Sequence, residues 1–298
     1  MMAAFRGRIR AQYSMIFGGV RRAGQIRSIP IRHLRPWAGI VCAALLLAAG
    51  ATWSVAQPVG TGDGEISQRR AAERRSFTDA EILDGFYKVT FGAEFHVAGG
   101  VDRVRKFVGP VRVFIDNRAT PDRTRQVDAT IADIRKRVHG IDLARAPDRE
   151  SANIVVMLIH DRDLARTIRS VYGIDRARRI QRSLQPQCLS GFRKDEHSRI
   201  LHSDVIIVAD AGDFVFFDCI YEELLQALGP INDDTTVPWT MFNDDVQMGF
   251  FDRYDQYLLN ILYDPRIRPG MTRAEVQELM PAVLPAARAF VEGGGGPP

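Results

Sequence analysis

The feature that most constrains this chain is an uncharged, apolar run near its N-terminus, residues 37–56. About 20 such residues are enough to span the roughly 30 Å hydrocarbon layer of a membrane as a helix. Residues 1–36 form a basic leader without lysine or acidic residues, and its eight arginines are Arg6, Arg8, Arg10, Arg21, Arg22, Arg27, Arg32 and Arg35. By the positive-inside rule, this asymmetry predicts a cytoplasmic N-terminus and export of the rest of the chain. We therefore expect a periplasmic or secreted protein.

The apolar run is consistent with two kinds of export segment. Ser54 and Ala56 are small residues ahead of Gln57, which fits a cleavable signal peptide. The leader is long for a signal peptide, so either translation starts at Met15 or the run remains uncut as an anchor in the inner membrane. A buried core helix is a third interpretation, disfavoured because core helices rarely continue this far without a charge.

The overall charge does not indicate a nucleic-acid partner. The 298 residues carry a net charge of +4, but without the eight leader arginines 32 basic residues remain against 36 acidic ones. The basic character therefore belongs to the leader, and we exclude nucleic-acid binding by the rest of the chain. With 46% hydrophobic residues, the chain has enough apolar material for a folded core.

Export gives the cysteines a structural interpretation. Cys42 lies inside the apolar run, whereas Cys188 and Cys219 lie in the part expected to be exported. Two thiols in an oxidising compartment usually pair, so we predict a Cys188–Cys219 disulfide; two unpaired buried cysteines are the alternative. Without nearby histidines, the two cysteines do not indicate a zinc site.

The remaining sequence predicts one domain over residues 76–284, between a linker (57–75) and a disordered tail (285–298). Capping boxes at Thr78–Glu81 and Thr272–Glu275 each predict the start of a helix. Predicted strands and helices then alternate, followed by a helix-rich C-terminal part; the predicted strands are 111–115, 153–159 and 204–209. This order predicts an α/β or α+β fold with a mixed sheet.

One helix and its C-terminal turn carry the polar residues of a candidate site. We expect the helix to be capped by Asp218 and to end at Gly229. Glu222 and Gln226 are four residues apart and share a helix face. The candidate cleft residues are Glu222, Glu223, Gln226, Gly229, Asn232 and Asp233. Because a glycine permits a sharp turn, we expected Asn232 to return toward that face.

This spacing resembles the motif of the metzincin zinc endopeptidases, in which three histidines hold zinc and a glutamate acts as general base. Glu222, Gln226 and Asn232 stand at the histidine positions, Glu223 matches the general base and Gly229 matches the turn glycine. Residues 239–242, which contain Met241, stand where a methionine turn is expected. Together with the later blocks 242–244 and 262–271, the pattern is similar to a bacterial exported family known only as a domain of unknown function.

The resemblance implies a metzincin-like scaffold with a central motif helix that has lost its zinc chemistry. Amide oxygens replace imidazoles, and the six histidines of the chain show no ligand spacing, so zinc is not expected. A hard divalent cation such as Ca²⁺ or Mg²⁺, or no metal, fits these side chains better. An amphipathic surface helix that stops at a glycine is the competing interpretation.

Three functions remain open. The first is an exported protein of the cell envelope that binds a protein or peptide in the old substrate cleft, without zinc catalysis. The second is a hydrolase in which Glu223 is the general base, with a non-zinc metal or none. The third is a membrane-tethered structural protein of the envelope.

Overall fold

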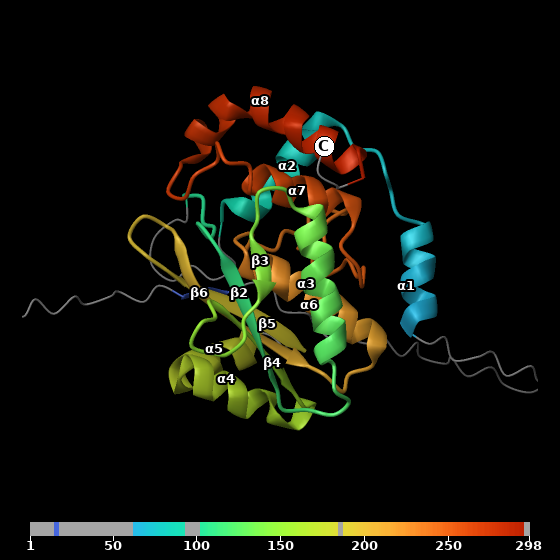
Figure 1. Ribbon diagram of the computed structural model, residues 1–298, viewed down its shortest axis with the longest axis vertical. Helices are drawn as coiled ribbons and strands as arrows, with labels where there is room; N and C mark the ends of the chain where they lie inside the picture. Colours follow the sequence, from blue (N-terminus) through green and yellow to red (C-terminus); the bar gives the residue numbers. More distant parts are fainter. Residues whose placement is uncertain (1–14, 18–61, 93–101, 184–186, 295–298) are drawn as a thin grey trace, which may run out of the picture.

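The computed structural model places a mixed sheet at the centre of the fold (Figure 1). It describes residues 15–17, 62–92, 102–183 and 187–294. Within these residues the strand order is β1-β5-β6-β4-β2-β3. Strands β2, β3, β4 and β6 are parallel, whereas β5 is antiparallel to both β6 and β1. The strands are β1 (Met15–Phe17), β2 (Val111–Asn117), β3 (Leu143–Arg145), β4 (Ile154–Ile159), β5 (Cys188–Lys194) and β6 (Ile200–Val208). The predicted mixed α/β architecture is confirmed.

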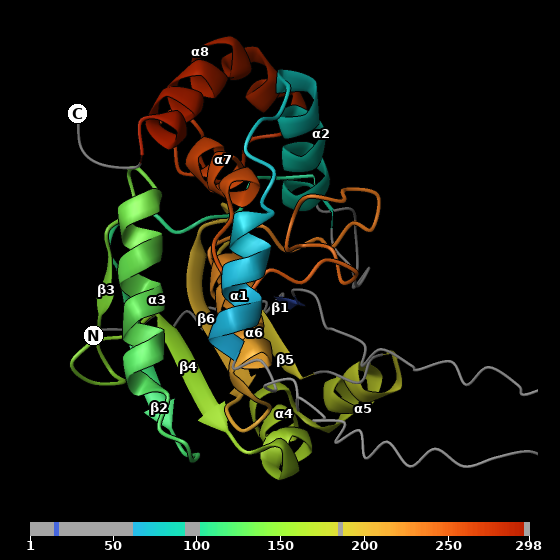
Figure 2. The ribbon, with the colours of Figure 1, turned by 90° about the vertical axis from the view of Figure 1, so that its right-hand side faces the viewer.

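Helices cover both faces of this sheet (Figure 2). Helix α6 packs on β5 and β6 and α3 packs on β2 and β3, whereas α4 lies on the opposite face. The helices are α1 (Gly62–Ala71), α2 (Asp79–Thr90), α3 (Thr124–Arg137), α4 (Leu164–Tyr172), α5 (Ile174–Ser183), α6 (Asp213–Ala227), α7 (Arg253–Leu262) and α8 (Arg273–Glu292), with a 3₁₀ turn at Asp161–Asp163. Strand β4 is buried along its whole length, as its unbroken apolar run predicted.

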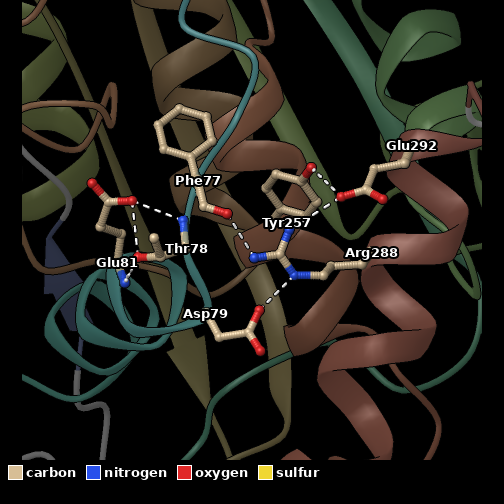
Figure 3. Close-up of polar contacts among 7 residues, drawn as sticks. All are labelled: Phe77, Thr78, Asp79, Glu81, Tyr257, Arg288 and Glu292. Carbon is tan, nitrogen blue, oxygen red and sulfur yellow. Dashed lines mark hydrogen bonds and ion pairs between the residues drawn. The ribbon is translucent and has the colours of Figure 1, made fainter.

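Arg288 of α8 contacts both the start of α2 and helix α7 (Figure 3). From α8, its Nη2 donates to the carbonyl oxygen of Phe77 at 2.6 Å and its Nε donates to Asp79 Oδ1 at 2.6 Å. Its guanidinium also lies 5.5 Å from the centre of the Tyr257 ring on α7. One half-buried cation thereby connects the start of α2 with α7 and α8.

Local signals located the start of two helices correctly. Both predicted capping boxes are present, at Thr78–Glu81 before α2 and at Thr272–Glu275 before α8. Helix α3 begins at Thr124, three residues after Pro121.

Other parts of the prediction differ from the structure. The expected linker 57–75 contains α1, whose arginines Arg69 and Arg70 lie over the rings of Phe214 and Phe250. The expected tail 285–298 is helical as far as Glu292, because α8 continues through its two prolines. Strands β3 and β5 were not predicted, and β1 lies in the stretch interpreted as a leader.

The apolar run 37–56 lies outside the described residues. Among the residues that the structure does describe, no helix is long and apolar enough to cross a membrane.

The predicted disulfide is confirmed. It joins Cys188 at the start of β5 to Cys219 in α6, across 31 positions of the sequence. Both cysteines are buried, so the bond fixes the motif helix against the antiparallel strand beside it.

Replacing both cysteines by alanine is expected to lower the free energy of unfolding by about 3–4 kcal/mol, because a cross-link of this loop length restricts the unfolded chain. Urea unfolding of the oxidised protein, the reduced protein and the double variant measures this difference. The reduced protein should unfold at the same urea concentration as the double variant. An unchanged midpoint after reduction would contradict the expected stabilisation.

Candidate functional site

The candidate site is built on α6, which is buried on almost every side. All ten residues from Asp218 to Ala227 are buried, and Glu222, Glu223 and Gln226 are 0% exposed. Asp218 does not cap the helix, as we had expected. The helix begins at Asp213, after Gly212 with φ of +93°, so Asp218 lies inside it.

Three carboxylates converge at the C-terminal half of this helix. One side-chain oxygen from each of Glu222, Asp233 and Asp244 lies within 4.8 Å of the other two. Glu222 is fully buried, whereas Asp233 and Asp244 are half-buried. We call these three residues the carboxylate cluster. Three oxygen ligands at this spacing could hold a hard cation such as Ca²⁺ or Mg²⁺.

Gln226 connects the carboxylate cluster to the sheet. Its Nε2 donates to Asp233 Oδ1 at 2.8 Å, and its Oε1 accepts a hydrogen bond from Ser190 Oγ of β5 at 3.4 Å. The structure therefore brings together the predicted residues Glu222, Gln226 and Asp233. Glu223 is next to Glu222 on α6, and its side chain is also fully buried.

Asn232 is bound to the end of α2. Its Nδ2 donates to the carbonyl oxygen of Lys88 at 2.9 Å, and its backbone N–H donates to the carbonyl oxygen of Val89 at 3.3 Å. The predicted turn at Gly229 is present with φ of +143°, and a Cβ there would lie 2.3 Å from the carbonyl oxygen of Arg105. The end of α2 therefore holds Asn232, and its expected return to the face of Glu222 stays a prediction.

The loop that carries Asp244 is held by two buried aspartates. Asp218 Oδ1 accepts hydrogen bonds from the backbone N–H groups of Met248 at 2.8 Å and Gly249 at 3.1 Å. Asp255 Oδ2 on α7 accepts from the backbone N–H of Met241 at 2.8 Å. Asp244 was not predicted as part of the site; its sequence signal is its place in block 242–244 of the family resemblance.

The start of α7 concentrates negative charge in the core. Asp252 Oδ1 accepts from the backbone N–H groups of Tyr254 and Asp255, at 2.8 and 3.2 Å, while its Oδ2 is buried with no hydrogen-bond partner among the described residues. Burial raises the pKa of Asp252 well above its usual range, and the charge of Asp255 raises it further. Burial also raises the pKa of Asp255.

Comparison with known proteins gives one match. The model of a family described as protein of unknown function (DUF2927) matches residues 79–282, which is more than half of the chain. No curated protein and no solved structure matches the chain. The matched range lies inside the expected domain 76–284 and contains α6 and the loop of Asp244.

Asp252→Asn is expected to stabilise the protein by about 1 kcal/mol at pH 8, because it removes the cost of keeping an ionisable group in the core beside a second carboxyl group and keeps the capping oxygen. Because the pKa of Asp252 is raised in the folded protein, its contribution to the free energy of unfolding is fully present below about pH 4, the usual aspartate pKa. That contribution is lost as the pH rises through the raised pKa. The stability difference should therefore vanish below pH 4. Urea unfolding from pH 3 to pH 8 measures it.

The matched control for this prediction is Asp245→Asn, an exposed aspartate in the neighbouring loop, which should leave the pH dependence unchanged. A loss of stability at pH 8 in Asp252→Asn would show that its charge is needed at the start of α7.

Proposed function

The chain belongs to the DUF2927 family of proteins of unknown function, and we propose that it is an exported cell-envelope protein that binds an extended peptide along β5. In this proposal the domain is a degenerate relative of zinc peptidases and works without zinc catalysis. The observation that carries the proposal is that the outer edge of β5 accepts an extended segment beside α6.

That extended segment is β1. It pairs with β5 in antiparallel register, with Met15 opposite Arg193, Ile16 opposite Phe192 and Phe17 opposite Gly191. An open strand edge offers backbone N–H and C=O groups to an added strand, and this mode of binding depends little on side-chain identity. Since β1 precedes the apolar run 37–56, export would separate it from the domain and leave this edge to another peptide.

The same strand leads to the carboxylate cluster. Ser190 of β5 is one residue from Gly191, the partner of Phe17, and its hydroxyl donates to Gln226, which in turn donates to Asp233. A peptide on this edge would therefore run past half-buried carboxylates. Their charge favours peptides with lysine or arginine side chains at this end of the strand.

Hydrogen bonds at the former zinc positions support the loss of zinc chemistry. Gln226, at the position of the second histidine, accepts a hydrogen bond from Ser190 and donates one to Asp233. Asn232, at the position of the third, donates a hydrogen bond to the carbonyl oxygen of Lys88. The disulfide supports export, because structural disulfides form in oxidising compartments.

A synthetic peptide of residues 11–21 is expected to bind residues 57–298 saturably, because it contains the β1 sequence. Peptides N-methylated either at Met15 and Phe17 or at Ile16 test the mode of binding. Successive amides of a strand point in opposite directions, so only one of the two methylation patterns should abolish binding. Fluorescence anisotropy measures the affinities.

Equal binding of both methylated peptides would contradict strand addition, and no binding of the unmodified peptide would contradict the proposed function. Circular dichroism of residues 57–298 serves as the control that this part of the chain is folded.

The carboxylate cluster favours a second candidate, a hydrolase that uses a hard divalent cation with Glu223 as general base. Three carboxylate oxygens within 4.8 Å are the observation behind it. Under this candidate, elemental mass spectrometry should find about one Ca²⁺ or Mg²⁺ per chain, lost in Glu222→Gln because a ligand charge is removed. The exposed Glu278→Gln is the matched control.

Metal-free protein with both variants folded would remove this candidate and leave peptide binding. One zinc ion per chain would contradict the proposed loss of zinc chemistry.

A further inference from the structure

We propose that a cavity on the α4 face of the sheet binds a small molecule through an oxyanion, a phosphate or a carboxylate. The cavity has a volume of about 530 Å³, and its charged and hydroxyl lining includes Arg118, Arg149, Arg193, Thr167, His202 and Asp204. We call it the arginine cavity. It lies on the face of the sheet opposite α6, and it shares Arg193 of β5 with the strand edge of the proposed peptide site.

The cavity exists because α4 covers the sheet only in part. Its floor is formed by Val155 and Met157 of β4, and one wall by Thr167, Ser170 and Val171 of α4. Helix α4 has only nine residues. On β5 the residue opposite Asp204 is a glycine, Gly191, which places no side chain over that part of the sheet.

Arg193 supplies an unused donor in this cavity. Its side chain is half-buried, and its Nε is buried without a hydrogen-bond partner among the described residues. A buried donor left unpaired is destabilising, so a ligand acceptor that pairs with it in the cavity would remove this cost. A guanidinium presents its N–H groups in a planar fork that matches the oxygens of a carboxylate or phosphate.

Two more arginines at the cavity are held in place by one carboxylate. Asp116 of β2 accepts from Arg118 Nε at 2.9 Å and from Arg149 Nη1 at 2.8 Å. These interactions orient both guanidinium groups and neutralise only one of the two charges. Together with Arg193, they leave an excess of positive charge that an anion would balance.

The other polar residues restrict the ligand further. His202 Nε2 lies 3.3 Å from Asp204 Oδ1, and both side chains line the cavity close to Arg193 in the sheet register. The Asp204 carboxylate can accept a hydrogen bond from a ligand hydroxyl. The volume falls within the roughly 300–1,000 Å³ typical of small-molecule sites. The ligand class is therefore a small, hydroxylated anion rather than a protein or a lipid.

Isothermal titration of the full-length protein in detergent, at low ionic strength, tests this proposal with inorganic phosphate and with citrate as probes. We expect saturable binding of at least one probe at one site per chain. Arg193→Gln should weaken it about tenfold or more, because a charge-assisted hydrogen bond is lost. Binding of phosphate alone identifies a phosphate ligand, and binding of citrate alone identifies a carboxylate.

The matched control is Arg178→Gln, the same substitution at an exposed arginine of α5 that does not line the cavity. Its affinity should equal that of the wild type. Arg149→Gln, at a more exposed arginine of the same cavity, serves if Arg193→Gln does not fold, and it should weaken binding several-fold. No saturable binding of either probe, or equal affinities in the cavity and control variants, would overturn the proposal.

Discussion

The burial of polar side chains on α6 is the constraint on which the rest of the structure depends. A helix buried on every side must satisfy its polar groups inside the protein, because an unpaired buried carboxylate is costly. Asp218 meets this demand by accepting two backbone N–H groups of the following loop, and Gln226 meets it between Ser190 and Asp233. The hydrogen bonds that satisfy the buried polar side chains of α6 therefore also position the carboxylate cluster.

The sheet separates two kinds of charge. On the α6 face are Glu222 and Glu223, whereas Arg193 lies in the arginine cavity on the other face. Strand β5 contributes to both, because its successive side chains alternate between faces: Ser190 contacts α6, and Arg193 lines the cavity. A single antiparallel strand thus connects the carboxylate cluster with the arginine cavity.

The sequence was most informative where structure depends on neighbouring residues. Capping boxes and the unbroken apolar run of β4 depend on local hydrogen bonding and burial, and both were predicted correctly. Strand β5 was missed because its pattern, with Gly191 at its centre, lacks a strong strand signal. Helix α1 was missed because its contacts are with distant residues and include cation–π interactions of Arg69 and Arg70 with the rings of Phe214 and Phe250, which no local pattern reveals.

The candidate site shows the limit of spacing as a guide to geometry. The motif predicted that Asn232 would follow Gln226 onto one face after the turn at Gly229. The turn exists, but the backbone N–H groups of Ile231 and Asn232 both donate to the carbonyl oxygen of Val89, which fixes this segment to α2. Asp233, the residue after Asn232, accepts a hydrogen bond from Gln226. Both of these bonds to Val89 span more than 140 positions of the chain, so no local pattern of residues could have predicted where the segment after Gly229 is fixed.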